Sequence, residues 1–200
     1  MSERIRGIRA NVKDYALQFL RQGREGWDIE HTRAVAYYAE KIATSEGLDT
    51  EVLIAAAWLH DIGYYGLFED ADPAQYTHIT DRKQLHMIIG AKLAEKFFQT
   101  PEAASLYTPQ QIQKIVHLVE VHDDFEKLGK SREEIVLMEA DTLGSIDLKR
   151  VTPTFDYKNG INYIEALKGK RLPRFQTMLG KQFLAELLPL FVAYFEKKKP

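Results

Sequence analysis

Apolar residues recur at helical spacing along almost the whole chain, and no alternating strand pattern of useful length appears. The spacing predicts a first helix from Ile8 to Phe19 and a second from an N-cap at Asp28 to Gly47. Five further helices are expected at about residues 50–61, 81–99, 110–122, 131–147 and 174–197. The pattern therefore predicts an all-α fold, a bundle of about six to eight helices with a C-terminal helical extension.

Three stretches interrupt the helical pattern. Residues 63–80 form an expected loop with aromatic and acidic side chains, and a loop of that length commonly has a function. Pro101 and Pro109 bracket a short segment, and Pro153 and Gly160 interrupt a less regular stretch. No repeat, low-complexity segment or linker marks a boundary, so we expect one domain over residues 1–200.

Composition and charge exclude several classes of protein. The formal net charge of −2 gives no footprint for a nucleic-acid polymer, and the absence of cysteine excludes disulfides, thiolate zinc sites and a cysteine nucleophile. Any metal must be held by histidine and carboxylate ligands. Residues 1–6 lack the apolar core of a signal peptide, and we expect no apolar run long enough to span a membrane. A soluble cytoplasmic protein is the default expectation.

Five histidine and aspartate positions fall on the apolar faces of different expected helices. They are His31, His60, His86, His122 and Asp141. A single inward histidine is more often a hydrogen-bonded core residue than a ligand, and Asp141 alone could be an N-cap or an ion-pair partner. The whole set is harder to explain in this way, because each buried polar group would need its own partner in one small core.

Histidines and aspartates that converge without cysteine suit a divalent metal: Mn, Fe, Co, Ni, Zn or Mg, with one or two ions per chain. His60 and Asp61 are adjacent, so on a regular helix their side chains would point about 100° apart. Both can face one ion only if the helix ends or distorts there. Gly63 gives the helix a reason to end at this point.

Other polar and aromatic residues near these positions have simpler explanations beside functional ones. His117 lies on the opposite side of its helix and is expected at the surface or behind the site, and His78 is expected to be an ordinary loop residue. Three cations could neutralise a substrate, or could be solvated surface charges. They are Arg33, Arg82 and Lys83. Within the loop, Tyr64, Tyr65 and Phe68 could stack on a base or simply pack the loop down.

In this order and context, His31, the pair His60-Asp61 and Asp141 resemble the H…HD…D signature of the HD-domain superfamily of metal-dependent phosphohydrolases, in particular its small bacterial members. The segment from Ala55 to Gly63 looks like the second motif of that family, and the helices that carry its further histidines look like residues 86–94 and 119–122. The resemblance covers roughly residues 25–150 and leaves 151–200 as the C-terminal extension.

The resemblance implies an all-α fold with a metal held by four residues, and two more histidines as second-metal or phosphate ligands. The metal ligands would be His31, His60, Asp61 and Asp141, and the additional ligands His86 and His122. Two features depart from family patterns. Tyr64 stands where many members have Lys, and His122 is followed by Asp123 and not by a second His, so activity of the cyclic-di-GMP branch is not implied.

The implied activity is hydrolysis of a phosphate ester, of a nucleotide or of another small phosphorylated metabolite, by a water that the metal activates. In this hypothesis Asp61 binds metal and orients the water, while His86 or His122 stabilises the phosphoryl group or protonates the leaving group. Two alternatives remain, a di-iron oxygenase and a non-catalytic module that binds a nucleotide or a protein. No membrane or nucleic-acid partner is expected, and a homodimer is possible through the last helix.

Overall fold

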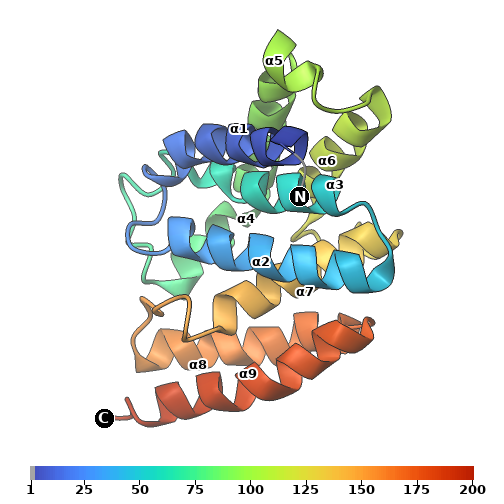
Figure 1. Ribbon diagram of the computed structural model, residues 1–200. Coiled ribbons are helices and arrows are strands. Elements are labelled where there is room, and N and C mark those ends of the chain that lie inside the picture. The colour runs from blue at the N-terminus through green and yellow to red at the C-terminus, as the bar shows by residue number, and fades with distance from the viewer. Residues whose placement is uncertain (1–2) are drawn as a thin grey trace.

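The computed structural model describes the backbone of residues 3–200 and the side chains from residue 7 onward; Met1 and Ser2, which belong to the segment examined for a signal peptide, lie outside it. Over the described range the chain forms nine α-helices, eight of them longer than two turns, and no strand (Figure 1). The helices are α1 Glu3–Leu20, α2 Asp28–Glu46, α3 Thr50–Leu59, α4 Tyr76–Phe98, α5 Pro101–Ala104, α6 Pro109–Val121, α7 Arg132–Ile146, α8 Tyr157–Ala166 and α9 Met178–Glu196. The predicted all-α class is confirmed.

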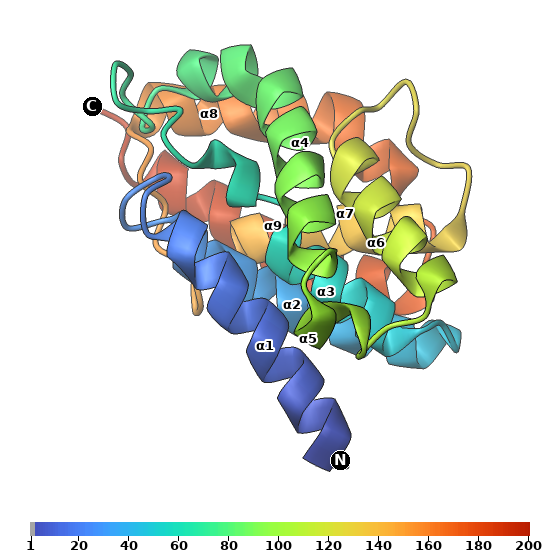
Figure 2. The same cartoon turned by 90° about the horizontal axis from the view of Figure 1, so that it is seen from above.

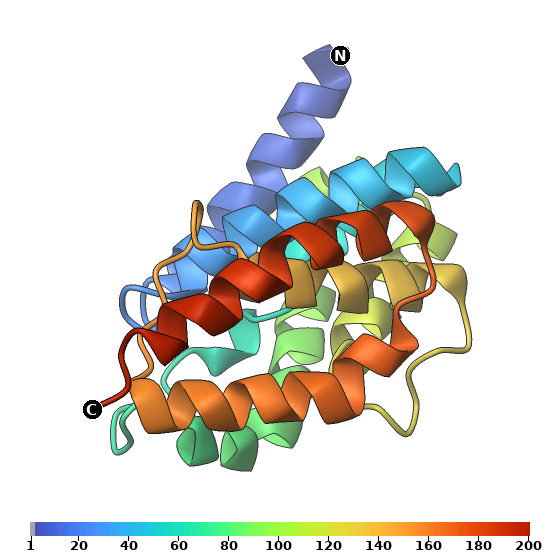
Figure 3. The ribbon, with the colours of Figure 1, turned by 90° about the horizontal axis from the view of Figure 1, so that it is seen from below.

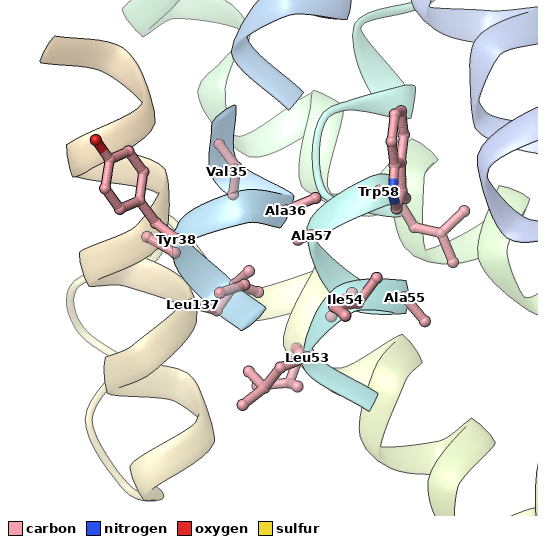
Figure 4. Packing of buried hydrophobic residues seen from close by; sticks show 14 of the residues in the cluster. Val35, Ala36, Tyr38, Leu53, Ile54, Ala55, Ala57, Trp58 and Leu137 are labelled. Atoms are coloured by element: carbon pink, nitrogen blue, oxygen red, sulfur yellow. The ribbon is translucent and has the colours of Figure 1, made fainter. Parts of the chain in front are cut away.

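Helix α3 lies at the centre of the bundle, packed against α1, α2, α6 and α7 (Figure 2). Every residue of α3 from Val52 to Leu59 is buried. In the close view of Figure 4, Val35 of α2, Leu53 of α3 and Leu137 of α7 belong to one continuous core. Each such side chain contributes roughly 1.5–3 kcal/mol by leaving water. The alanine-rich sequence of α3 lets its neighbours approach closely from several sides.

Several helix ends follow local sequence rules, and the predicted end of the second helix at Gly47 is confirmed. Asp49 caps α3 by accepting hydrogen bonds from the amides of Glu51 and Val52, and Gly47 ends α2 with a left-handed φ of 66°. Thr108 forms a capping box with Gln111 at the start of α6. These local rules fix where the ligand-bearing helices begin, and therefore which of their turns reach the centre.

Other boundaries differ from the sequence prediction. Asp28 is the first residue of α2 and not its N-cap, because its carboxylate accepts hydrogen bonds from Arg24 instead of from the helix amides. Helix α4 starts at Tyr76 and α9 at Met178, so α4 is longer and α9 shorter than predicted. Gly160 interrupts nothing: it lies inside α8, and a Cβ there would come within 2.6 Å of Phe195 Cζ. Gly160 is thus a contact point between α8 and α9.

The C-terminal extension covers one face of the bundle. Helices α8 and α9 lie next to each other (Figure 3); α9 packs on α7 and α2, and α8 packs on α4. Phe191 and Phe195 of α9 are completely buried. Between α8 and α9 the chain makes one π-helical turn, Leu167–Arg171, and one 3-10 turn, Leu172–Arg174. The extension therefore packs back on the residues that precede it.

Helix α9 is, by length and composition alone, apolar enough to cross a membrane, with a mean hydropathy of 1.3 over its most apolar window. The expectation that no apolar run reaches this length is therefore wrong for α9. The same test is passed by core helices of soluble proteins, and Phe191 and Phe195 show α9 used for packing. Its outer face leaves Met178 and Leu190 exposed.

Candidate metal centre

Five elements of the bundle each direct a buried histidine or aspartate to one place. They contribute His31 from α2, His60 and Asp61 from the end of α3, His86 from α4, His122 from the end of α6 and Asp141 from α7. The most exposed of the six is Asp141, at 6%. The structure thus brings together all six residues that the sequence singled out, and none of the six is at the surface.

The chain leaves α-helical geometry between His60 and Asp61, as the sequence predicts. Helix α3 ends at Leu59, and Asp61, with φ −104° and ψ 4°, precedes the 3-10 turn η1, Ile62–Tyr64. This change lets the two neighbouring side chains face each other, with His60 Nε2 3.3 Å from Asp61 Oδ2. The backbone bend, not a regular helix, creates the pair.

Gly63 is required at this bend for a reason that the sequence does not show. Its φ is not positive, so no left-handed conformation demands glycine there. A Cβ on Gly63 would instead meet the backbone of α4, with Gly90 N at 2.6 Å and the His86 carbonyl carbon at 2.8 Å. The missing side chain lets α4 lie directly against η1 and brings His86 to the site.

The six residues form two groups that share Asp61. In the first group, His31 Nε2 lies 3.3 Å from His60 Nε2 and 3.5 Å from Asp61 Oδ2. Asp141 Oδ1 joins this group, 3.1 Å from His31 Nε2. In the second group, His86 Nε2 and His122 Nε2 lie 3.2 Å apart, at 3.6 and 3.7 Å from the other oxygen, Asp61 Oδ1. Asp61 therefore presents one carboxylate oxygen to each group.

Hydrogen bonds behind two of the imidazoles orient them for ligation. Nδ1–H of His60 donates to the carbonyl of Ala57 at 2.7 Å, and Nδ1–H of His122 donates to the carbonyl of Val119 at 2.8 Å. A carbonyl only accepts, so each Nδ1 carries the proton and each Nε2 keeps its lone pair in the neutral ring. Both lone pairs point into the cluster.

The residues present fit divalent metal. Two ligand atoms, each ~2.1 Å from one ion, lie roughly 3.0–3.4 Å apart for ordinary coordination angles, and the two Nε2 pairs have spacings of 3.3 and 3.2 Å. Without an ion, each pair needs a proton on Nε2 of His31 or of His86, whose Nδ1 atoms are buried without a hydrogen-bond partner. Histidine and aspartate ligands without cysteine form a donor set that binds Mn, Fe, Co, Ni or Zn. Two groups of three potential ligands, whose ligand atoms all lie within 4.8 Å of one another, share Asp61.

Electrostatics keep both aspartates ionised. Burial opposes their charge, but His60 and Arg24 outweigh it at Asp61, and Arg171 and His31 at Asp141, so the pKa of each carboxyl lies well below its ordinary value. Both are then available as anionic ligands across the physiological pH range.

The pKa values of His60 and His86, one histidine from each group, are shifted in opposite directions. Burial opposes protonation of His60, yet the carboxylates of Asp61 and Asp141 outweigh burial and raise its pKa to about 9. In the second group, burial and the neighbouring His122 lower the pKa of His86 to about 3. His86 is therefore a neutral imidazole, the form that binds metal.

Two arginines that the sequence did not single out complete the site, Arg24 buried and Arg171 partly buried. Arg24 donates from Nη2 to Asp61 Oδ2 at 2.5 Å, and Arg171 donates from Nη1 to Asp141 Oδ2 at 2.7 Å. Both lie in turns, where no helical period marks a residue as inward. The only signal for Arg24 was its place between Gly23 and Gly26, just before the first predicted ligand-bearing helix.

Arg24 is held by a dedicated set of contacts. Asp28 Oδ1 accepts from its Nε at 2.5 Å and Asp28 Oδ2 accepts from its amide at 2.6 Å. A Cβ on Gly23 would collide with this carboxylate. The guanidinium carbon lies 4.1 Å from the ring centroid of Tyr64. The same ring stacks on the imidazole of His86, with the two centroids 4.1 Å apart.

Of the three cations considered from the sequence, only Lys83 lines the cavity at this site. Arg33 pairs with Glu30 on the surface, and Arg82 donates to the carbonyl of Leu67 and to Asp70. The positions of Arg33 and Arg82 therefore do not support a role in substrate binding, because both side chains are bonded to other groups away from the cavity.

The remaining histidines lie away from the cluster. His117 is half exposed and contacts Glu134 at 3.1 Å, and exposed His78 contacts the carbonyl of Asp72 at 3.1 Å. Neither lines the cavity. The expected surface position of His117 is confirmed, whereas the expectation of a loop position for His78 is wrong, because α4 starts at Tyr76 and includes His78 in its first turn.

A cavity of about 250 Å³ opens beside the ligands. The aromatic residues that line the cavity differ from the three loop aromatics that we expected there. Tyr65 packs on Phe19 and Phe68 packs on Tyr64, so only Tyr64 of these three lines the cavity. The aromatic wall comes instead from α4 and the segments that flank α2, α6 and α8. Its members are Trp27, Tyr76, Phe125, Phe155 and Tyr163.

Comparisons with known proteins agree with this geometry. The model of the HD domain family matches residues 28–145, more than half of the chain. A crystal structure described as a predicted HD superfamily hydrolase from an uncultured Thermotogales bacterium superposes with a TM-score of 0.59. It is 20% identical, and the match covers 96% of this chain and 89% of that one, so it supports the fold. No curated protein matches significantly. With its H…HD…D residues gathered in one buried cluster, the chain belongs to the HD-domain family.

Proposed function

We propose that the protein is a metal-dependent phosphohydrolase that cleaves a phosphate ester of a nucleotide or another small metabolite. The observation that carries this proposal is the shared carboxylate of Asp61, whose two oxygens face two separate groups of ligands. Together with nearby cations and the adjoining cavity, this arrangement supports a reaction in which negative charge develops next to a polarised water.

In this proposal the first group of ligands holds one divalent ion and the second group holds another. The first group is His31, His60, Asp61 and Asp141, and the second is Asp61, His86 and His122. Divalent metal held there supplies Lewis acidity and lowers the pKa of water to near neutrality. The two-ion assignment is supported by the Nε2 spacing in both groups.

The side chains around the ligands have distinct roles in this proposal. Asp61 orients the attacking water, because it is the residue common to both groups. Arg24 and Arg171 keep Asp61 and Asp141 in place through one oxygen each. His86, with its lowered pKa, is a poor proton donor, so we assign it to ligation and not to protonation of the leaving group.

The test combines metal analysis with turnover. Protein purified without added metal is analysed for bound elements and assayed on p-nitrophenyl phosphate and nucleoside monophosphates with Mn, Co, Ni and Mg. Asp61→Asn is the inactive variant, and Asp81→Asn, an exposed change on α4, is its matched control. We expect two ions per chain, and turnover that Asp61→Asn lowers by roughly 100-fold or more and Asp81→Asn leaves unchanged.

Two outcomes would overturn the proposal. Two tightly bound irons without phosphatase activity would favour the di-iron oxygenase. Neither metal nor turnover under any condition would leave a module that binds a nucleotide or a protein without catalysis.

A further inference from the structure

Arg171 belongs to the C-terminal extension, outside residues 28–145 that match the family model. It is the last residue of the π-helical turn Leu167–Arg171, which follows α8 directly. Such wide turns are rare and frequently occur at functional sites. Here the turn places a guanidinium from the extension among groups of the metal centre.

The contacts of Arg171 use only part of its donor capacity. Nη1 donates to Asp141 Oδ2 at 2.7 Å and to Thr142 Oγ1 at 3.1 Å, and Nη2 donates to Asp123. A guanidinium carries five N–H donors. Two of them, Nε–H and one on Nη2, have no acceptor among the residues that the structure describes, although Arg171 lines the cavity. The side chain is fixed and still able to bind an anion.

Asp123 holds a second cation next to Arg171. Its Oδ1 also pairs with Lys83 Nζ at 3.0 Å. Both cations lie over the ring of Phe125, at 4.2 Å from the ring centroid for Lys83 and 5.5 Å for Arg171. One carboxylate thus serves two positive side chains. The cavity lining as a whole carries four Lys or Arg side chains (Arg24, Lys83, Lys170 and Arg171) against three aspartates (Asp61, Asp123 and Asp141). An anionic ligand would therefore gain most of its binding energy at this wall of the cavity.

Another part of the cavity wall is aromatic. Four aromatic rings form a connected set around Phe155. The centroid of the Phe155 ring lies 6.5 Å from that of Trp27, 6.2 Å from that of Tyr76 and 5.6 Å from that of Tyr163. The cavity of about 250 Å³ is just below the ~300–1,000 Å³ usual for ligand sites. This volume suits one small organic group and leaves little room for a second substituent on the phosphorus.

We infer that Arg171 and Lys83, held in place by Asp123, bind the phosphoryl group of a phosphomonoester whose organic part is a single aromatic or base-like group. The assignment of a substrate rests on the proposed hydrolase function, whereas the anion site itself does not. A terminal phosphate carries two charges and three free oxygens, so it can face the metal ligands and the Arg171–Lys83 pair together. A diester has one charge fewer and a second substituent to place.

The first experiment measures binding of inorganic phosphate to the full-length, metal-loaded protein by titration calorimetry. Arg171→Met and Lys83→Met each remove one cation, and Lys168→Met, an exposed change in the same π turn, is the matched control. Loss of a charge-assisted hydrogen bond should weaken phosphate binding roughly 10-fold or more in both variants and leave the control unchanged.

Arg171→Met also removes a contact to Asp141, so metal content is measured for each variant. Lys83→Met leaves that contact in place and should keep wild-type metal content while phosphate binding falls. If both variants bind phosphate within about twofold of wild type, the inference is wrong, whatever the turnover. If phosphate binding depends on Arg171 but no ester is hydrolysed, the anion site stands and the proposed hydrolase function fails.

The second experiment tests the organic part by competition. Phenyl phosphate, methyl phosphate and diphenyl phosphate compete with the substrate, or with inorganic phosphate in the calorimeter. We expect phenyl phosphate to bind roughly 10-fold more tightly than methyl phosphate, and diphenyl phosphate to bind most weakly, because stacking adds affinity and volume limits it. Replacing Phe155 by Leu should remove most of the preference for the phenyl ester. Equal binding of the three esters would contradict the assignment of a monoester with an aromatic group.

Discussion

Replacing Gly63 by Ala tests whether the approach of α4 to the turn η1 assembles the second group of ligands. The added Cβ would lie 2.6 Å from Gly90 N and 2.8 Å from the carbonyl carbon of His86, and the His86 carbonyl oxygen would be nearer still. All three are backbone atoms, so no side chain can rotate away. Restoring an ordinary contact of 3.4 Å to Gly90 N alone takes a shift of about 0.8 Å, and the nearer His86 carbonyl oxygen requires α4 to move further than this.

The size of the effect follows from this displacement. Overpacking of a rigid core costs about 1–3 kcal/mol, and a contact between two backbones belongs at the upper end of that range. His86 belongs to α4 and moves with it. Its Nε2 would therefore move away from Asp61 Oδ1, which is now 3.6 Å distant, and from His122. We therefore expect loss of one metal ion, from the group that contains His86, and retention of the ion bound near His31.

The assay is urea unfolding combined with elemental analysis. For a chain of this size, with an m-value of about 2–3 kcal/mol per M, a loss of 3 kcal/mol lowers the unfolding midpoint by about 1–1.5 M. Gly7→Ala is the control, since a Cβ there meets nothing within 4 Å, and it should stabilise α1 by up to about 1 kcal/mol. A Gly63→Ala protein with wild-type stability and two bound ions would refute the reasoning.

Three further predictions concern charge and packing. Arg24→Met leaves two buried carboxylates without their cation and should destabilise the fold by about 3–5 kcal/mol in urea unfolding; a loss below 1 kcal/mol would contradict this. Gly160→Ala should cost about 1–3 kcal/mol, and Phe195→Leu in the same chain should restore part of it by making room; an additive double variant would argue against a direct contact. Burial opposes ionisation of Glu134, but His117 and two backbone amides outweigh it and lower its pKa. Its stabilisation is thus complete above the ordinary glutamate pKa of 4.5 and is lost as the pH falls through the lower folded pKa, so the stability advantage over Glu134→Gln should shrink in acid; an advantage independent of pH would contradict it.

The parts of the fold that the sequence predicted are those governed by local rules. Asp49, Gly47 and Thr108 act within one helical turn of their own position, so the helix ends that they set are readable from the chain. The 3.6-residue period likewise placed His31 and His86 on buried faces, since the same apolar stripe that packs the helix carries the ligand.

The parts that were missed depend on contacts between distant segments. Gly160 looks like a helix breaker until Phe195, on another helix, packs against it. Arg24 and Arg171 lie in turns, which have no period to show the direction of a side chain. Their partners Asp61 and Asp141 were identified, but a list of ligands does not reveal which cation will reach their second oxygens.

The position of Trp27 gives the protein an internal optical signal. Its indole stacks on the ring of His31, with centroids 5.4 Å apart and planes 18° from parallel. A change of charge on that imidazole alters the surroundings of the indole directly, so emission from Trp27 should follow ligation of His31 without any added dye. The chain has one other tryptophan, Trp58, which packs in the core beside Lys13, and replacing it by Phe would leave a single fluorophore next to the site. Occupancy could then be followed in real time, in stopped-flow mixing, during loading and release of the ion.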